Sequence, residues 1–71
     1  MEPRYSTEEP IRIQGAEPSL YNLLAIALAR MTRLGVPYQE RERFKSRVLT
    51  AFTYEISVQI IREYFAVELE D

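Results

Sequence analysis

Apolar residues recur at a helical spacing in the first half of the chain. One helix face is marked at intervals of four and three residues by Leu20, Leu24, Ala27, Met31 and Leu34. Pro18 suits the first turn of a helix, and Gly35 followed by Pro37 is a stop signal. The pattern predicts a helix from about Pro18 to Leu34. Because Leu23, Ile26 and Leu28 lie off the main face, this helix is expected to pack between several neighbours.

The second half of the chain has two overlapping periods. Residues 38–70 contain no Gly, Pro, Asn or Asp, so no turn residue of these types interrupts them. Apolar residues recur every seven positions at Phe44, Ala51, Val58 and Phe65, and a second series interleaves at Arg47, Tyr54 and Ile61. This seam predicts one long helix from about Tyr38 to Leu69. Small hydroxyl residues beside it, Ser46, Thr50, Thr53 and Ser57, would let another helix approach closely.

A strand at 51–60 is the alternative interpretation of the same region. From Phe52 to Ile60 the chain alternates apolar and polar residues and is rich in β-branched and aromatic types. The helical interpretation is preferred because both flanking segments favour helix. The predicted fold class is therefore all-α, a helical hairpin with a long second helix, and the alternative is an α+β fold.

The N-terminal residues show no helical period. Residues 1–10 are polar and include two prolines, which is typical of a flexible arm. Ile11–Gln14 alternates briefly, so a short extended segment that pairs with a copy of itself is expected there. The predicted organisation is an arm at 1–16 and a single helical-hairpin domain at 17–71.

The chain is short for a self-sufficient core. Its 71 residues contain neither Cys nor His, so disulfides are excluded and a zinc site is improbable. Nearly half of the residues are apolar, which favours oligomerisation as the source of stability. We therefore expect a homo-oligomeric bundle, most simply a homodimer. Its predicted interface consists of Phe44, Ala51, Tyr54, Val58, Ile61 and Phe65.

Charge is unevenly distributed along the sequence. Residues 18–47 carry six Lys or Arg and two Glu, a net charge of +4, whereas residues 1–17 and 48–71 carry −2 and −4. The cations of the middle segment form a basic elbow around the predicted turn, which is the candidate partner-binding site: Arg30, Arg33, Arg41, Arg43, Lys45 and Arg47. The function expected from this pattern is a non-enzymatic regulator or adaptor that binds a protein partner.

Two other functions are compatible with the sequence. The order of elements, IRIQ and then two helices, resembles that of ribbon-helix-helix repressors, which would make the chain a nucleic-acid-binding dimer that uses the basic elbow. The first helix is longer than in that family, and the segment before the candidate ribbon is acidic. A small helical enzyme that holds an anionic substrate is the other alternative, with candidate residues on one helix face: Lys45, Glu55, Gln59 and Arg62.

No cofactor or metal is expected, and no catalytic residue is assigned. The longest mostly apolar segment, residues 20–29, is shorter than the roughly 20 residues that a membrane-spanning helix needs. A cytoplasmic protein without membrane contact is therefore expected.

Overall fold

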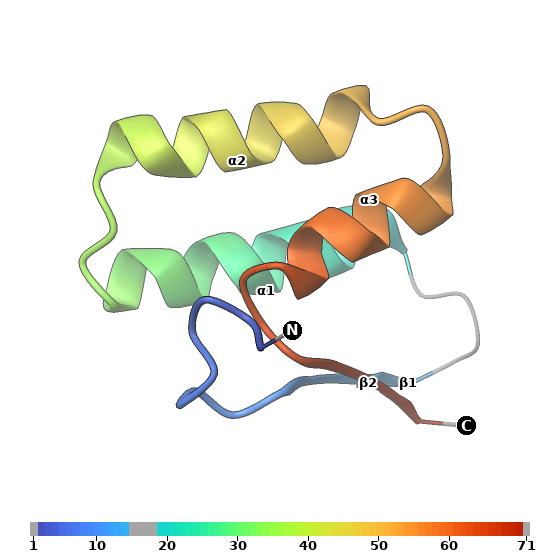
Figure 1. Cartoon of the computed structure of the whole chain (residues 1–71), viewed down its shortest axis with the longest axis horizontal. Helices are drawn as coiled ribbons and strands as arrows, with labels where there is room; N and C mark the ends of the chain where they lie inside the picture. Colours follow the sequence, from blue (N-terminus) through green and yellow to red (C-terminus); the bar gives the residue numbers. More distant parts are fainter. Residues whose placement is uncertain (1, 15–18, 71) are drawn as a thin grey trace.

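Three helices and a small parallel sheet make up the fold in a computed structural model that describes residues 2–14 and 19–70, with the backbone alone at 69 and 70. The elements follow one another as β1 (Ile11–Gln14), α1 (Leu20–Arg33), α2 (Tyr38–Thr50), α3 (Tyr54–Arg62) and β2 (Val67–Glu70). The helices pack above the sheet (Figure 1). The sheet pairs the first and last elements of the chain, β1 and β2, side by side. The chain is mainly helical, as expected, but it is not purely so.

Helix α1 lies where the apolar period predicts a helix. The residues it buries are Leu23, Leu24, Ala27 and Met31, and its neighbours are α2, α3 and β1. A helix that is apolar on most sides is therefore covered by its own chain. Gly35 ends it with a φ of 80°, a backbone conformation that residues with a Cβ rarely adopt. The predicted start at Pro18 and the predicted domain boundary at 16 and 17 lie outside the described residues.

The prediction of one long helix from Tyr38 to Leu69 is wrong. Helix α2 ends at Thr50, residue 51 is extended with ψ at 146°, and α3 begins at Tyr54. Thr53 starts the new helix because its hydroxyl oxygen accepts a hydrogen bond from the Ile56 N–H at 3.1 Å. The alternative strand at 51–60 is also wrong, since most of that segment is α3.

The break lets the chain cover its own apolar seam. A straight helix would carry Val58 and Ile61 away from Phe44, whereas the reversal at residues 51–53 places all three in one core. Ser57 joins the two helices, because its buried hydroxyl donates a hydrogen bond to the Val48 carbonyl at 2.9 Å. Burial of these side chains offsets the cost of interrupting the helix.

The sheet pairs the two ends of the domain in parallel. Its register places Ile11 opposite Val67 and Arg12 opposite Glu68. Ile11 is fully buried under the helices, whereas Arg12 and Glu68 form an ion pair at 3.3 Å on the exposed side. The alternating sequence of Ile11–Gln14 thus forms a strand, but its partner is β2 of the same chain rather than a second copy.

The N-terminal residues pack on the domain instead of forming the separate arm that their composition suggested. The N–H groups of Arg4 and Tyr5 donate to the carbonyls of Glu63 and Tyr64, both at 2.8 Å. The Tyr5 ring stacks on Phe65 with a centroid distance of 5.1 Å. These contacts cross almost the whole sequence, and local composition carries no signal for them.

Removing the Thr53 cap is expected to destabilise the domain modestly. Thr53→Ala leaves the Ile56 N–H without its acceptor, and the loss of an N-cap hydroxyl costs about 1 kcal/mol. Thr53→Ser keeps the oxygen and is the control. Urea denaturation followed by circular dichroism measures the unfolding free energies of both variants. Equal values would show that the Thr53 hydroxyl does not stabilise the start of α3.

Candidate functional site

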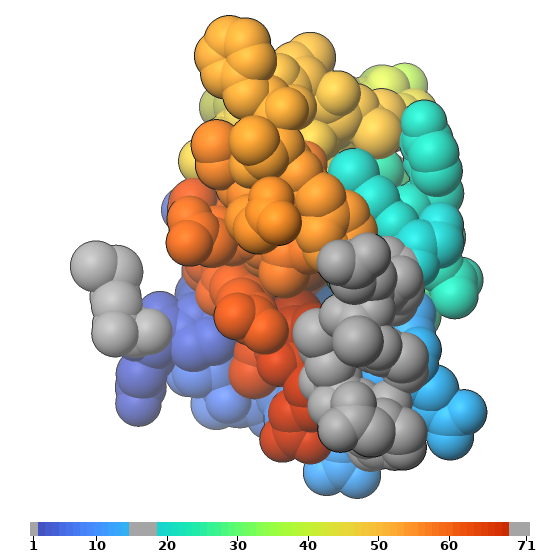
Figure 2. Space-filling view, turned by 90° about the vertical axis from the view of Figure 1, so that its right-hand side faces the viewer, coloured from blue at the N-terminus to red at the C-terminus, as the bar shows by residue number. Residues whose placement is uncertain are grey.

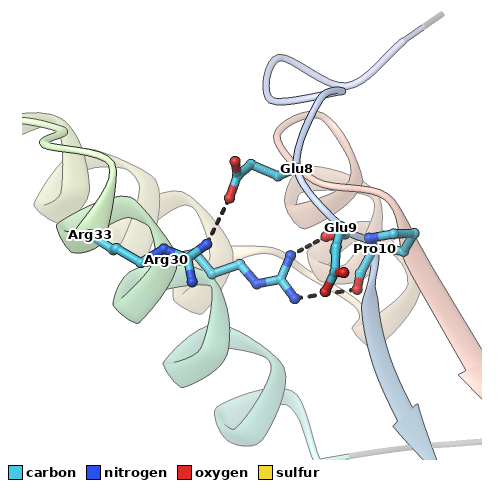
Figure 3. A network of polar contacts seen from close by, with 5 residues as sticks. All are labelled: Glu8, Glu9, Pro10, Arg30 and Arg33. Atoms are coloured by element: carbon cyan, nitrogen blue, oxygen red, sulfur yellow. Dashed lines mark hydrogen bonds and ion pairs between the residues drawn. The ribbon is translucent and has the colours of Figure 1, made fainter.

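Two cations of the basic elbow hold the N-terminal segment against α1. The Arg33 guanidinium forms an ion pair with Glu8 at 2.7 Å. Arg30 donates to the backbone carbonyl of Glu9 and, at 3.3 Å, to that of Pro10 (Figure 3). Both side chains reach from the last turns of α1 to the residues that precede β1. Their positive charge is therefore used to attach one part of the chain to another.

Two more cations of the elbow, Arg41 and Lys45, have partners within the chain. Arg41 donates to the Val36 carbonyl at 3.2 Å and to the Thr32 hydroxyl at 2.9 Å, which closes the turn between α1 and α2. Lys45 lies 3.9 Å from Glu42 on the same helix. The elbow is thus less available to an external partner than the sequence alone suggests.

Arg47 forms a two-pronged pair with Glu63. Its two terminal nitrogens donate to the two carboxylate oxygens at 3.3 and 3.2 Å, which links α2 to the end of α3. The hydrogen bonds that Arg47 donates to the Glu63 carboxylate raise the pKa of Arg47, and this effect outweighs the opposing effect of desolvation.

The side chain of Arg43, the sixth member of the elbow, has no hydrogen bond or ion pair with residues 2–14 and 19–68. It borders a pocket of about 300 Å³ between the N-terminal segment, the α1–α2 turn and α2. The residues lining this pocket, which we name the arginine pocket, are Arg4, Tyr5, Met31, Val36, Glu40, Arg43, Arg47 and Tyr64. Sequence analysis identified Arg43 and Arg47 but missed Arg4, which lies in the segment interpreted as an arm.

The predicted oligomer interface lies mostly inside a single chain. Phe44, Val58, Ile61 and Phe65 all belong to the buried core, while Ala51 and Tyr54 are partly buried against it. The apolar period correctly marked these positions as needing burial. The covering elements come from the same chain, so this burial does not require a second copy. Oligomerisation stays a prediction.

Three exposed apolar residues lie in and beside the reversal between α2 and α3. Phe52 is 100% exposed, and Leu49 and Ile56 on either side of it are each more than 40% exposed. We name these three residues the Phe52 corner. Side chains of this connection project into solvent at one end of the molecule (Figure 2). The apolar pattern of the sequence did not single out these three residues as exposed, since it assigned the apolar positions of this region to packing faces of one long helix.

The residues considered for anionic-substrate chemistry are not gathered at one place. Gln59 and Arg62 line a second hollow of about 620 Å³, together with Glu2, Arg4 and Glu63. Lys45 lies on α2, where it pairs with Glu42. The break between the helices separates Lys45 from the face of α3 that a continuous helix would have given it.

The chain matches no protein-family model, no curated protein and no solved structure in comparisons with known proteins. Within the described ranges, no helix is long and apolar enough to cross a membrane. The same ranges hold no cluster of three or more acidic side chains arranged to bind a metal ion. The class of protein that the fold defines is a small, mainly helical domain closed by a two-stranded parallel sheet.

Proposed function

We propose that this chain is a non-enzymatic protein–protein interaction module, a regulator or adaptor, that binds its partner through the Phe52 corner. The observation that carries the proposal is the complete exposure of the Phe52 ring. A buried phenylalanine stabilises a fold by about 1.5–3 kcal/mol, and Phe52 contributes nothing of this kind to its own domain. Placed in a partner's pocket, the same ring would contribute that burial to binding.

The surroundings of Phe52 also suit an interface. Leu49 and Ile56 extend the apolar surface on both sides, and the exposed charges of Lys45 and Glu55 lie next to them in α2 and α3. An apolar centre with a mixed polar rim is the usual composition of protein interfaces, and aromatic anchors supply most of their binding energy. The partner is therefore a protein with an apolar pocket wide enough for a phenyl ring.

The geometry supports this proposal more than the nucleic-acid alternative. Five of the six elbow cations, all except Arg43, are engaged within the chain. In ribbon-helix-helix repressors the strand pairs across a dimer, whereas β1 here pairs with β2. Salt dependence separates the two functions, because phosphate binding weakens steeply as salt rises and binding through an apolar corner does not.

Substituting Phe52 by Ser is expected to weaken partner binding at least tenfold while leaving folding intact. The stability should change by less than about 0.5 kcal/mol, because the ring makes no buried contact. A photo-crosslinking phenylalanine analogue at position 52 identifies the partner in an extract, and titration with the purified partner then gives the affinities of the native chain and the variant.

The same analogue at Tyr38, an exposed aromatic position at the far end of α2, is the matched control. A partner that crosslinks at 52 but not at 38, and whose affinity falls with Phe52→Ser, supports the proposal. Equal crosslinking at both positions, or an unchanged affinity, contradicts it. A crosslink only to a second copy of this chain would contradict the proposal and indicate that the Phe52 corner mediates self-association. Sedimentation equilibrium would then measure that self-association.

A further inference from the structure

Three arginines from distant parts of the sequence converge on one pocket. Arg4 comes from the N-terminal segment, whereas Arg43 and Arg47 lie one helical turn apart on α2. Neither Arg4 nor Arg43 has a carboxylate within ion-pair distance in the described part of the chain.

The charge of the arginine pocket is positive. Its lining holds three guanidinium groups and one carboxylate, that of Glu40, which leaves a net charge of +2. Glu63 neutralises Arg47 from outside the lining, so +1 remains when this pair is included. An arginine that is already paired still offers its other N–H donors to a second acceptor. The pocket therefore suits a ligand with a single anionic head group.

Part of the pocket lining is apolar and aromatic, beside a larger polar part. Met31 is buried, and Tyr5, Val36 and Tyr64 pack partly buried against the core. The Tyr64 ring is held in place by Phe44, at a centroid distance of 4.8 Å, and the Arg4 guanidinium lies over it at 4.9 Å. A ring fixed in this way gives a ligand's apolar body a rigid surface, and it positions Arg4 at the rim of the pocket.

From this convergence we infer that the arginine pocket binds a small organic anion, with a carboxylate or phosphate head held by Arg4 and Arg43 and an apolar body on Met31 and Tyr64. Planar guanidinium groups bind such head groups through paired, charge-assisted hydrogen bonds. A volume of about 300 Å³ is at the lower end of the range for ligand pockets and fits a single-ring compound. The lining of this pocket shares no residue with the Phe52 corner.

Phenyl phosphate is the probe of choice, with binding followed by amide chemical shifts in nuclear magnetic resonance. We expect saturable binding whose largest shifts fall at residues 4–5, 36, 43, 47 and 64. Arg4→Gln and Arg43→Gln should each weaken binding about tenfold, the equivalent of about 1.4 kcal/mol. Arg62→Gln is the matched control, because Arg62 also has no carboxylate partner in the described ranges but lines the other hollow.

Each comparison can overturn the inference. Equal weakening in all three variants would indicate general charge attraction. Unchanged binding in Arg43→Gln would show that the arginine pocket is not the binding site. Benzamide matches benzoate in shape without its charge, so equal affinities for these two would exclude an anion site. If inorganic phosphate bound as tightly as phenyl phosphate, the apolar body of the ligand would contribute nothing to binding. Circular dichroism of every variant confirms that the fold is retained.

Discussion

Ile61→Asp is expected to unfold the domain at room temperature. Ile61 lies in α3 with 0% of its surface exposed, in the core shared by all three helices. The substitution removes about 1.5–3 kcal/mol of apolar burial and places a carboxylate where no charge partner is found. Since a domain of this size has a total stability on the order of 5 kcal/mol, the combined loss exceeds what it can tolerate. Circular dichroism during thermal melting measures the result.

Ile56→Asp is the matched control in the same helix. Ile56 is 43% exposed and lies in the first turn of α3, where a negative charge interacts favourably with the helix dipole. We expect this variant to stay folded, with an unfolding free energy within about 1 kcal/mol of the native chain. Similar melting curves for the two aspartate variants would contradict the placement of Ile61 in the core and of Ile56 on the surface.

Phe65→Ala is expected to destabilise the domain by about 3–5 kcal/mol, the usual cost of deleting a buried aromatic ring. Phe65 is fully buried after α3, and its ring stacks on Tyr5. The cavity would therefore loosen the N-terminal segment together with the core. Urea denaturation gives the loss of stability. Hydrogen exchange reports the loosening directly, because the amides of Arg4 and Tyr5 are bonded to the carbonyls of residues 63 and 64.

Two milder variants test the origin of this effect. Phe65→Leu keeps most of the buried volume and should lose less than half as much stability as Phe65→Ala. Tyr5→Phe keeps the stacked ring and should leave both the stability and the exchange of the Arg4 amide nearly unchanged. If Phe65→Ala left the amides of Arg4 and Tyr5 fully protected, the N-terminal segment would be held by its hydrogen bonds alone.

The elements with local signals were predictable. Helix α1 has a continuous apolar face, and Gly35 ends it because its positive φ is readily adopted only by glycine. The start of α3 also had a signal, since Thr53 is a good N-cap residue and Glu55 follows in the first turn. The absence of Gly, Pro, Asn and Asp from residues 38–70 outweighed that signal in the prediction of one long helix.

The candidate sites were predictable only in part. Arg43 and Arg47 were singled out by the charge of the middle segment, but Arg4 joins them only because residues 4 and 5 bond to the chain after α3. The arginine pocket thus joins residues that are distant in sequence, which no local pattern reports. Phe52 lies in the reversal between α2 and α3, and its full exposure follows from that reversal and not from the apolar pattern.

The sequence by itself determined which side chains must leave water, because the apolar periods marked Phe44, Val58, Ile61 and Phe65 whatever covered them. Only the tertiary structure decided what covers them. The reversal after α2 and the parallel pairing of β1 with β2 gain their stability from contacts across nearly the whole chain. Local patterns report the conformational preference and polarity of a segment, whereas these choices depend on the total burial that each arrangement of segments achieves.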